Sequence, residues 1–185
     1  MNWEYEDDKY IFFWKGLLSN WSNHGFDAKL EKTGKLLNFC RAEQYMMAQK
    51  AAVFDDNDSL QIIMMTNNPA LQKSFGRSVK GFDDEIWKEL ARDLSYIGIY
   101  QKFLQNERIR NILISTGNKV LAEASPYDRR WGIGFYHNDA IPNKEKWGGN
   151  WLGQILMKVR DDIRGGEDFC FDKIDWTKYE ELTRL

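Results

Sequence analysis

The stretch from Phe39 to Ala51 places one carboxylate and one amine on the same side of a predicted helix. Glu43, Met46, Met47 and Lys50 stand at i, i+3, i+4 and i+7, a spacing that puts them on one helical face. A Glu in apolar surroundings is disfavoured as an anion, so Glu43 is a candidate for a raised pKa. Two interpretations stay open here. Either these residues line the mouth of a pocket, or a solvated Glu and Lys flank a core-facing Met pair.

The number and spacing of the His, Cys and Gly residues argue against several kinds of catalytic site. The only His residues are His24 and His137, and the only Cys residues are Cys40 and Cys170; none has metal-ligand spacing, so we expect no metal site. No spacing supports a Ser/His/Asp or Cys/His arrangement, and there is no Walker phosphate loop. Gly132-Ile133-Gly134 lacks the third glycine of a dinucleotide fingerprint, so we expect no cofactor.

What remains is a set of carboxylates, Lys, Arg and aromatic side chains. That set suits a glycosidase-like site, because a carboxylate can stabilise the oxocarbenium-like transition state of glycosidic cleavage or activate water. The chain also has 8 Trp, whose flat faces suit heterocyclic or sugar ligands. Composition alone therefore favours a ligand-binding protein.

Composition also limits the class of protein. The chain has 185 residues, a length typical of one domain, and a net charge of −2, which gives no general basic surface for nucleic acid or membrane. No apolar run approaches the roughly 20 residues that span a bilayer, and the acidic N-terminus lacks a signal-peptide core. We therefore predict a cytoplasmic protein without a membrane partner, with its thiols reduced.

Strands and helices mix without βαβ alternation, which predicts an α+β fold that is mostly helical with a small β-sheet. Residues 1–166 are expected to form one domain, and the tail 167–185 is expected to pack on it through Phe169, Phe171, Trp176 and Tyr179. Residues 137–146 are predicted to be a surface loop. Predicted strands cover 10–14, 26–30, 36–39 and 119–124, and predicted helices cover 41–54, 60–66, 69–76, 84–104, 107–114 and 152–163.

Several helix ends are predicted from capping residues. Asp58 is a good N-cap for the helix that follows the acidic cluster, and Gly76 is a natural terminator of the helix that Asn68-Pro69 opens. Asp83 or Asp84 is expected to cap the longest helix. The apolar face of that helix is predicted from its helical spacing to consist of Ile86, Leu90, Leu94, Ile97 and Phe103.

Five segments, in this order and at these distances, resemble the NADAR, or YbiA-like, domain over about residues 10–164. They are Phe13-Trp14-Lys15-Gly16 with Ser19-Asn20-Trp21, the helix Ala42–Ala51, Gly76-Arg77-Ser78-Val79, Trp131-Gly132-Ile133-Gly134, and Asn150-Trp151-Leu152-Gly153 through Met157. Some members of the family have Asp between the two loop glycines where Ile133 stands here. Asp128, just upstream, is then the better acidic candidate.

The resemblance implies a YbiA-like fold and N-glycosidase activity. The family includes proteins that hydrolyse the N-glycosidic bond of early riboflavin-pathway intermediates, which are phosphoribosylamino-pyrimidines. Other members remove ADP-ribose from guanine in DNA. The implied partner is a small ribosyl-phosphate or ADP-ribosyl substrate, with ADP-ribosylated DNA as the larger alternative.

The resemblance places Glu43 at the family's catalytic position, where it would assist attack at the anomeric carbon. Lys50 would bind phosphate or ribose, or capture the opened sugar as a Schiff base; its alternative is a solvated helix-end Lys. Asp128 would bond to ribose hydroxyls or orient the amine; its alternative is to shape the turn after Pro126.

The predicted substrate-binding residues are amides, aromatics, a glycine and one Arg. Arg77 would hold phosphate through its planar fork, with a carbonyl cap or surface ion pair as its alternative. Stacking on the base or ribose is predicted for the Trp residues, with core packing as the alternative, above all for Trp87. Loop capping is the alternative for the two Asn residues. The full set is Asn20, Trp21, Arg77, Trp87, Trp131, Gly132 and Asn150.

Two other function classes remain open. A non-catalytic nucleotide or ADP-ribose binding module would use the same pocket without turnover, which the presence of Glu43 and Lys50 argues against. An interaction protein would dock a partner through the aromatic residues of the tail. Release of product from a ribosylated substrate separates the first class from the enzyme, and oligomer mass with and without residues 167–185 tests the second.

Overall fold

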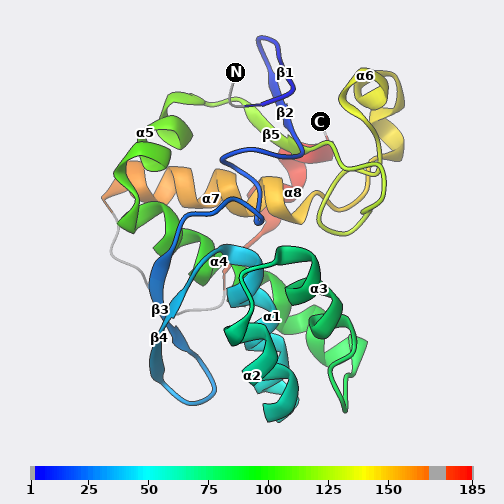
Figure 1. The fold of residues 1–185 in the computed structure, drawn as a ribbon. Coiled ribbons are helices and arrows are strands. Elements are labelled where there is room, and N and C mark those ends of the chain that lie inside the picture. The colour runs from blue at the N-terminus through cyan, green and yellow to red at the C-terminus, as the bar shows by residue number, and fades with distance from the viewer. Residues whose placement is uncertain (1–2, 167–173, 185) are drawn as a thin grey trace. The chain divides into compact units, whose positions relative to one another are not determined.

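The computed structural model describes residues 3–166 and 174–184, which divide into two compact units (Figure 1). The helical unit is the continuous segment Asn20–Asn106. The sheet unit combines Met1–Ser19 with Glu107–Leu185. The α+β class is confirmed, with helices dominating and the strands divided between a three-stranded sheet and a two-stranded hairpin.

A helix that is buried along its length lies at the centre of the helical unit. This helix, α1, spans Ala42–Val53, and every residue from Ala42 to Ala52 is buried. The hairpin that delivers the chain into it pairs Phe26 with Phe39. Three further helices pack on α1. The other elements of the unit are β3 (Phe26–Leu30), β4 (Lys35–Phe39), α2 (Asn57–Met65), α3 (Pro69–Arg77) and α4 (Asp84–Gln105).

The sheet unit is built around a parallel pair of strands. Strand β2 pairs in parallel with β5, with Phe12 opposite Ala122, and β1 pairs with β2 in antiparallel fashion. Helix α7 packs on β5, and a Cβ on Gly153 of α7 would lie 2.1 Å from the Leu121 carbonyl oxygen. The unit contains β1 (Tyr5–Glu6), β2 (Tyr10–Phe13), α5 (Glu107–Ser115), β5 (Val120–Glu123), α6 (His137–Ala140), η1 (Ile141–Lys146), α7 (Trp151–Gly165) and α8 (Thr177–Arg184).

Two glycines let the neighbouring helices approach α1 closely. A Cβ on Gly76 of α3 would lie 1.9 Å from Met47 Sδ, and a Cβ on Gly98 of α4 would lie 2.2 Å from Tyr45 Cδ1. Neither distance is possible, so Met47 and Tyr45 occupy the space that these side chains would fill. The helix ends at Arg77, within the predicted segment Phe75-Gly76-Arg77, but Gly76 lies inside α3 and serves helix packing rather than termination.

Gly76→Ala is expected to destabilise the protein by about 1–3 kcal/mol, the usual cost of adding a methyl group to a filled core. Its Cβ forces Met47 to move, although Ala has the higher helix propensity. Urea unfolding followed by circular dichroism measures the effect, and Ser74→Ala on the exposed side of the same helix is the control. An unchanged or raised midpoint for Gly76→Ala would contradict the packing argument.

Three other local predictions are wrong. The N-cap of α2 is Asp56, whose carboxylate accepts from Ser59 N–H at 3.1 Å, so the helix begins two residues before Asp58 would allow. Residues 137–146 form α6 and η1 rather than a loop. On α4, Ile86 and Leu90 are exposed at 50% and 39%.

The buried face of α4 instead carries aromatic and small residues. Trp87, Ala91, Ser95 and Gly98 are all buried there. Small residues were not counted as apolar face markers, although they are what allows α4 to approach α1. Ile97 and Phe103 are buried as predicted, and Asp83 is the N-cap.

The described part of the C-terminal segment contains α8, which packs on α7. Tyr179 donates its hydroxyl to Asp161 Oδ2 at 3.0 Å, and Gln154 Nε2 donates to Thr183 Oγ1 at 3.1 Å. Phe169, Cys170 and Phe171 lie outside the described residues. The division into a domain 1–166 and a tail stays a prediction. Among the described helices, none combines the length and the apolar character needed to cross a bilayer.

Candidate active site

The predicted site residues divide between the two units. The helical unit holds Asn20, Trp21, Glu43, Lys50, Arg77 and Trp87. The sheet unit holds Asp128, Trp131, Gly132 and Asn150.

Glu43 lies in the first turn of α1 and is 3% exposed. Its backbone N–H donates to the Asn20 carbonyl oxygen at 3.0 Å, which ties the loop before the hairpin to the start of the helix. The interpretation in which a solvated Glu leads a core stripe is therefore wrong. A carboxylate at this point also lies near the positive end of the helix dipole, which favours negative charge.

Lys50 lies two turns further along α1 and is 7% exposed. Its Nζ lies 3.7 Å from the ring centroid of Phe82 and 5.9 Å from that of Trp87. Both rings are attractive to an ammonium group, since the face of an aromatic ring carries partial negative charge. The solvated alternative for Lys50 is wrong as well. Glu43 and Lys50 are about 10 Å apart along the helix axis, because seven residues separate them at a rise of about 1.5 Å per residue.

The aromatic wall around Lys50 comes from the beginning of α4. Asp83 caps this helix by accepting from Glu85 N–H at 2.9 Å and Ile86 N–H at 3.1 Å. Phe82 precedes the cap and Trp87 follows it at the spacing of a hydrophobic staple, which fixes where the chain enters the helix. Trp87 is 5% exposed, so its contact with Lys50 and its core packing coexist.

Of the other three predicted side chains of this unit, two face outward and one is buried. Trp21 is 43% exposed, so its indole is accessible for stacking. Arg77 lies exposed in the last turn of α3, where its guanidinium can reach an anion in solvent. Asn20 is buried, with its carbonyl oxygen bonded to the start of α1.

Asp128 shapes the loop that follows β5. Its Oδ1 accepts from Arg130 N–H at 3.0 Å and from Trp131 N–H at 2.8 Å. Trp131 is half-buried, and its ring meets Trp151 edge-to-face at a centroid distance of 5.5 Å. These contacts support the turn-shaping alternative for Asp128, and its catalytic role stays a prediction.

The substitutions Asp128→Ala and Asp128→Asn separate a turn-shaping role of this carboxylate from a catalytic one. Asp128→Ala is expected to lower stability by about 1 kcal/mol and to reduce turnover, because two backbone N–H groups lose their acceptor. Asp128→Asn keeps an acceptor oxygen and is expected to keep turnover within about threefold. Thermal unfolding and steady-state kinetics measure both. A folded Asp128→Asn without turnover would show that the carboxylate itself takes part in the reaction.

Gly132 and Asn150 join this loop to the rest of the sheet unit. A Cβ on Gly132 would lie 2.8 Å from the Glu123 carbonyl oxygen, so only glycine fits. Asn150 is 0% exposed and has a left-handed backbone (φ 47°). Its Nδ2 donates to the Leu121 carbonyl oxygen at 2.9 Å and its Oδ1 accepts from Glu123 N–H at 3.0 Å. A substrate would reach this amide only by displacing the bonds that hold β5.

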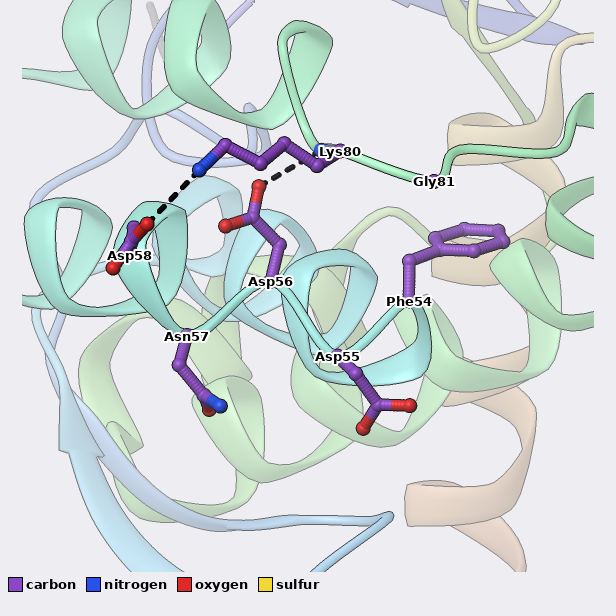
Figure 2. Close-up of a pocket in the computed structure, with 7 residues that line it drawn as sticks. All are labelled: Phe54, Asp55, Asp56, Asn57, Asp58, Lys80 and Gly81. Atoms are coloured by element: carbon purple, nitrogen blue, oxygen red, sulfur yellow. Dashed lines mark hydrogen bonds and ion pairs between the residues drawn. The ribbon is translucent and has the colours of Figure 1, made fainter.

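An open pocket lies beyond the C-terminal end of α1 (Figure 2). Hydrogen bonds from Lys80 N–H at 2.8 Å and from Ser59 hold the pKa of Asp56 at about 2, and Lys80 Nζ pairs with Asp58 at 2.9 Å. The carboxylates along its wall disfavour a phosphate-bearing ligand. The residues that line it are Phe54, Asp55, Asp56, Asn57, Asp58, Lys80 and Gly81.

Three residues near the predicted site were missed in the sequence. Phe82 was detectable from its staple position before Asp83. Arg41 and Lys102 are both buried, at 8% and 1% exposure, although Lys and Arg are rarely buried. The one signal for Lys102 is its position among buried residues of α4 next to Phe103, and nothing in the sequence marks Arg41.

Comparison with known proteins decides the family. A family model described as the NADAR domain matches residues 12–164. The chain belongs to the NADAR family. An N-glycosidase of Acanthamoeba polyphaga mimivirus is 37% identical over 167 residues, which cover 85% of this chain and 98% of the relative.

A plant protein and a solved bacterial structure are also similar to this NADAR chain. The chloroplastic riboflavin biosynthesis protein PYRR of Zea mays is 32% identical over 157 residues, 81% of this NADAR chain but 24% of that longer protein. The NMR structure of E. coli YbiA superposes with a TM-score of 0.66 at 22% identity, covering 91% of this chain and 94% of YbiA. YbiA therefore confirms the expected fold.

Proposed function

We propose that this NADAR protein is an N-glycosidase that hydrolyses the bond between a ribose and an amino-heterocycle. The observation that carries the proposal is the pair of buried ionisable side chains on α1, Glu43 and Lys50, in a chain 37% identical to a named N-glycosidase. Burying a carboxylate and an amine on one helix is costly for folding, and such groups concentrate at functional sites.

Glu43 is proposed to act on the anomeric carbon. Breaking the C–N bond leaves positive charge on the ribose, which a nearby carboxylate stabilises, and the same carboxylate can take a proton from the attacking water. The amino-heterocycle leaves with the bonding electron pair and is protonated to the free amine. The low exposure of Glu43 supports this role, since a carboxylate shielded from water by the surrounding protein interacts more strongly with the charge that develops on the ribose.

Lys50 has two proposed roles. As an ammonium it would bind a phosphate or a ribose oxygen; as an amine it would capture the opened sugar as a Schiff base. The Nζ lies 3.7 Å from the Phe82 ring centroid, and aromatic faces attract the charged form. This contact supports the electrostatic role over the nucleophilic one.

The remaining predicted residues are proposed to bind the substrate. Trp21 would stack on the leaving heterocycle through its exposed indole, and Arg77 would hold a phosphate in solvent. For Trp131 and Gly132, in the loop after β5 of the sheet unit, contacts with a substrate through the indole and the backbone stay predictions from the family resemblance. Asn150 would act through the shape of this loop, because its amide bonds to β5.

Two substrates fit this chemistry: ribosylamino-pyrimidine phosphates of riboflavin biosynthesis, and guanine bearing ADP-ribose in DNA, both acted on in the cytoplasm. The name of the Zea mays relative supports the first, as does the absence of a net positive charge on the chain. Purified protein offered both substrates should release the free heterocycle from one of them. Release of neither, by a folded protein, would overturn the proposed activity.

A further inference from the structure

The loop Asn20–Asn23, which we call the Trp21 loop, is held at its backbone by the start of α1. Glu43 N–H donates to the Asn20 carbonyl oxygen at 3.0 Å. Arg41 donates from one guanidinium nitrogen to the Trp21 carbonyl oxygen at 2.9 Å, and from the other to Asn23 Oδ1 at 3.3 Å and the Asn67 carbonyl oxygen at 2.9 Å. The backbone beside the exposed indole is thus fixed by a buried cation.

A buried lysine reaches the same loop from α4. Lys102 is 1% exposed, and its Nζ donates to Ser22 Oγ at 2.6 Å. Its Nζ also lies 5.2 Å from the ring centroid of Phe103. Burial lowers the pKa of Lys102 to about 7, which shows how strongly this position disfavours a charge.

An apolar side chain of the same length would fill this space at lower cost. Buried charged groups can often be replaced by hydrophobic residues of similar shape without loss of stability. What the amine provides is a defined partner for Ser22, next to the one residue of the loop whose large side chain faces solvent, Trp21.

We propose that Lys102 is a positioning residue, which holds Ser22 so that the Trp21 indole is preset as the stacking surface for the substrate's leaving heterocycle. The inference rests on the proposed N-glycosidase function. A preset indole binds a flat ring without first being ordered, whereas a free loop would lose conformational entropy at each binding event. Loss of the anchor should therefore weaken substrate binding and leave the step at Glu43 unchanged.

The test uses Lys102→Met and Ser22→Ala, which remove the same hydrogen bond from opposite ends. Each is expected to raise KM about fivefold, the size of effect that one net hydrogen bond gives, with kcat within about twofold. The double variant should match either single variant, and Ser22→Thr, which keeps the hydroxyl, should restore the wild-type KM. Lys119→Met, which removes a lysine bonded to Glu6 in the sheet unit, is the matched control and should leave KM unchanged.

Hydrogen exchange at residues 20–23 provides a readout that needs no turnover. Lys102→Met and Ser22→Ala should exchange faster there than the wild type, with an unfolding midpoint equal to or above that of the wild type for Lys102→Met. Unchanged exchange, or wild-type KM values in both single variants of an active enzyme, would overturn the inference alone. If both variants exchange faster but the wild-type protein turns over neither substrate, the proposed function is overturned and the anchoring of the loop by Lys102 stands.

Discussion

Glu43→Gln is expected to lower turnover by about 10²–10⁴-fold while the protein stays folded, because the amide keeps the shape of the side chain but neither carries charge nor accepts a proton. The side chain of Glu43 lies in the first turn of α1 and is 3% exposed, so the substitution removes a carboxylate that is held inside the protein. KM is expected to change little, since the carboxylate is proposed to act on charge that develops in the transition state. Release of the heterocycle under saturating substrate measures the effect.

The matched control for this variant is Glu107→Gln. Glu107 also stands in the first turn of a helix, α5, but is exposed and lies in the sheet unit. It should retain wild-type turnover, which separates loss of the reacting group from loss of a favourable helix-end charge. A folded Glu43→Gln with near-wild-type turnover would remove Glu43 from the chemistry.

Lys50→Met is the second large effect, expected mainly in KM. The variant keeps the apolar stem against Phe82 and Trp87 but removes the ammonium group. If Lys50 binds the anionic side of the substrate, KM for the phosphorylated substrate should rise by about 10–100-fold, the range of a hydrogen bond between charged groups. KM for the dephosphorylated substrate should change much less. Lys88→Met, at an exposed ion pair on α4, is the control.

The nucleophilic role of Lys50 makes a different prediction. A Schiff base would be reduced by borohydride to a stable secondary amine, which mass spectrometry would locate on Lys50. Trapping of that adduct, together with a collapse of kcat in Lys50→Met, would contradict the electrostatic role. No adduct with an intact kcat would leave the ammonium contact as the function of this side chain.

Much of the fold was predictable because its signals are local. The hairpin strands, the Asn68-Pro69 helix start and the Asp83 cap each depend on a few neighbouring residues, and the structure confirms them. The face of α4 was not, because it includes Gly98, which is buried by close packing against Tyr45 of α1, a helix distant in sequence. Gly76 misled for the same reason, since a glycine near a helix end is typical of a terminator and of a packing site alike.

The candidate site was predictable to a similar extent. Spacing put Glu43 and Lys50 on one face, and resemblance to the NADAR family selected that face for chemistry. The residues that surround them were harder to predict, because their partners come from other elements. Phe82 reaches Lys50 from the residue before the N-cap of α4, and Arg41 reaches the Trp21 loop from the N-cap position of α1. Asn150 was expected to donate to a ligand, but its side-chain amide bonds to β5 instead. Its backbone is left-handed, which no local sequence pattern predicts.

The parallel pairing of β2 with β5 has a consequence for synthesis on the ribosome. Tyr10 of β2 pairs with Val120 of β5. In the sequence, the whole helical unit Asn20–Asn106 comes after β2 and before β5 as one uninterrupted stretch. The contacts within that stretch become available while β5 has not yet been translated. Strand β2, with Ile11, Phe12 and Phe13 all destined for the core, must wait without its partner for that whole interval. In the nascent chain, β2 is therefore exposed to aggregation along the edge that β5 later covers, at a time when the helix that carries Glu43 and Lys50 is already complete in sequence.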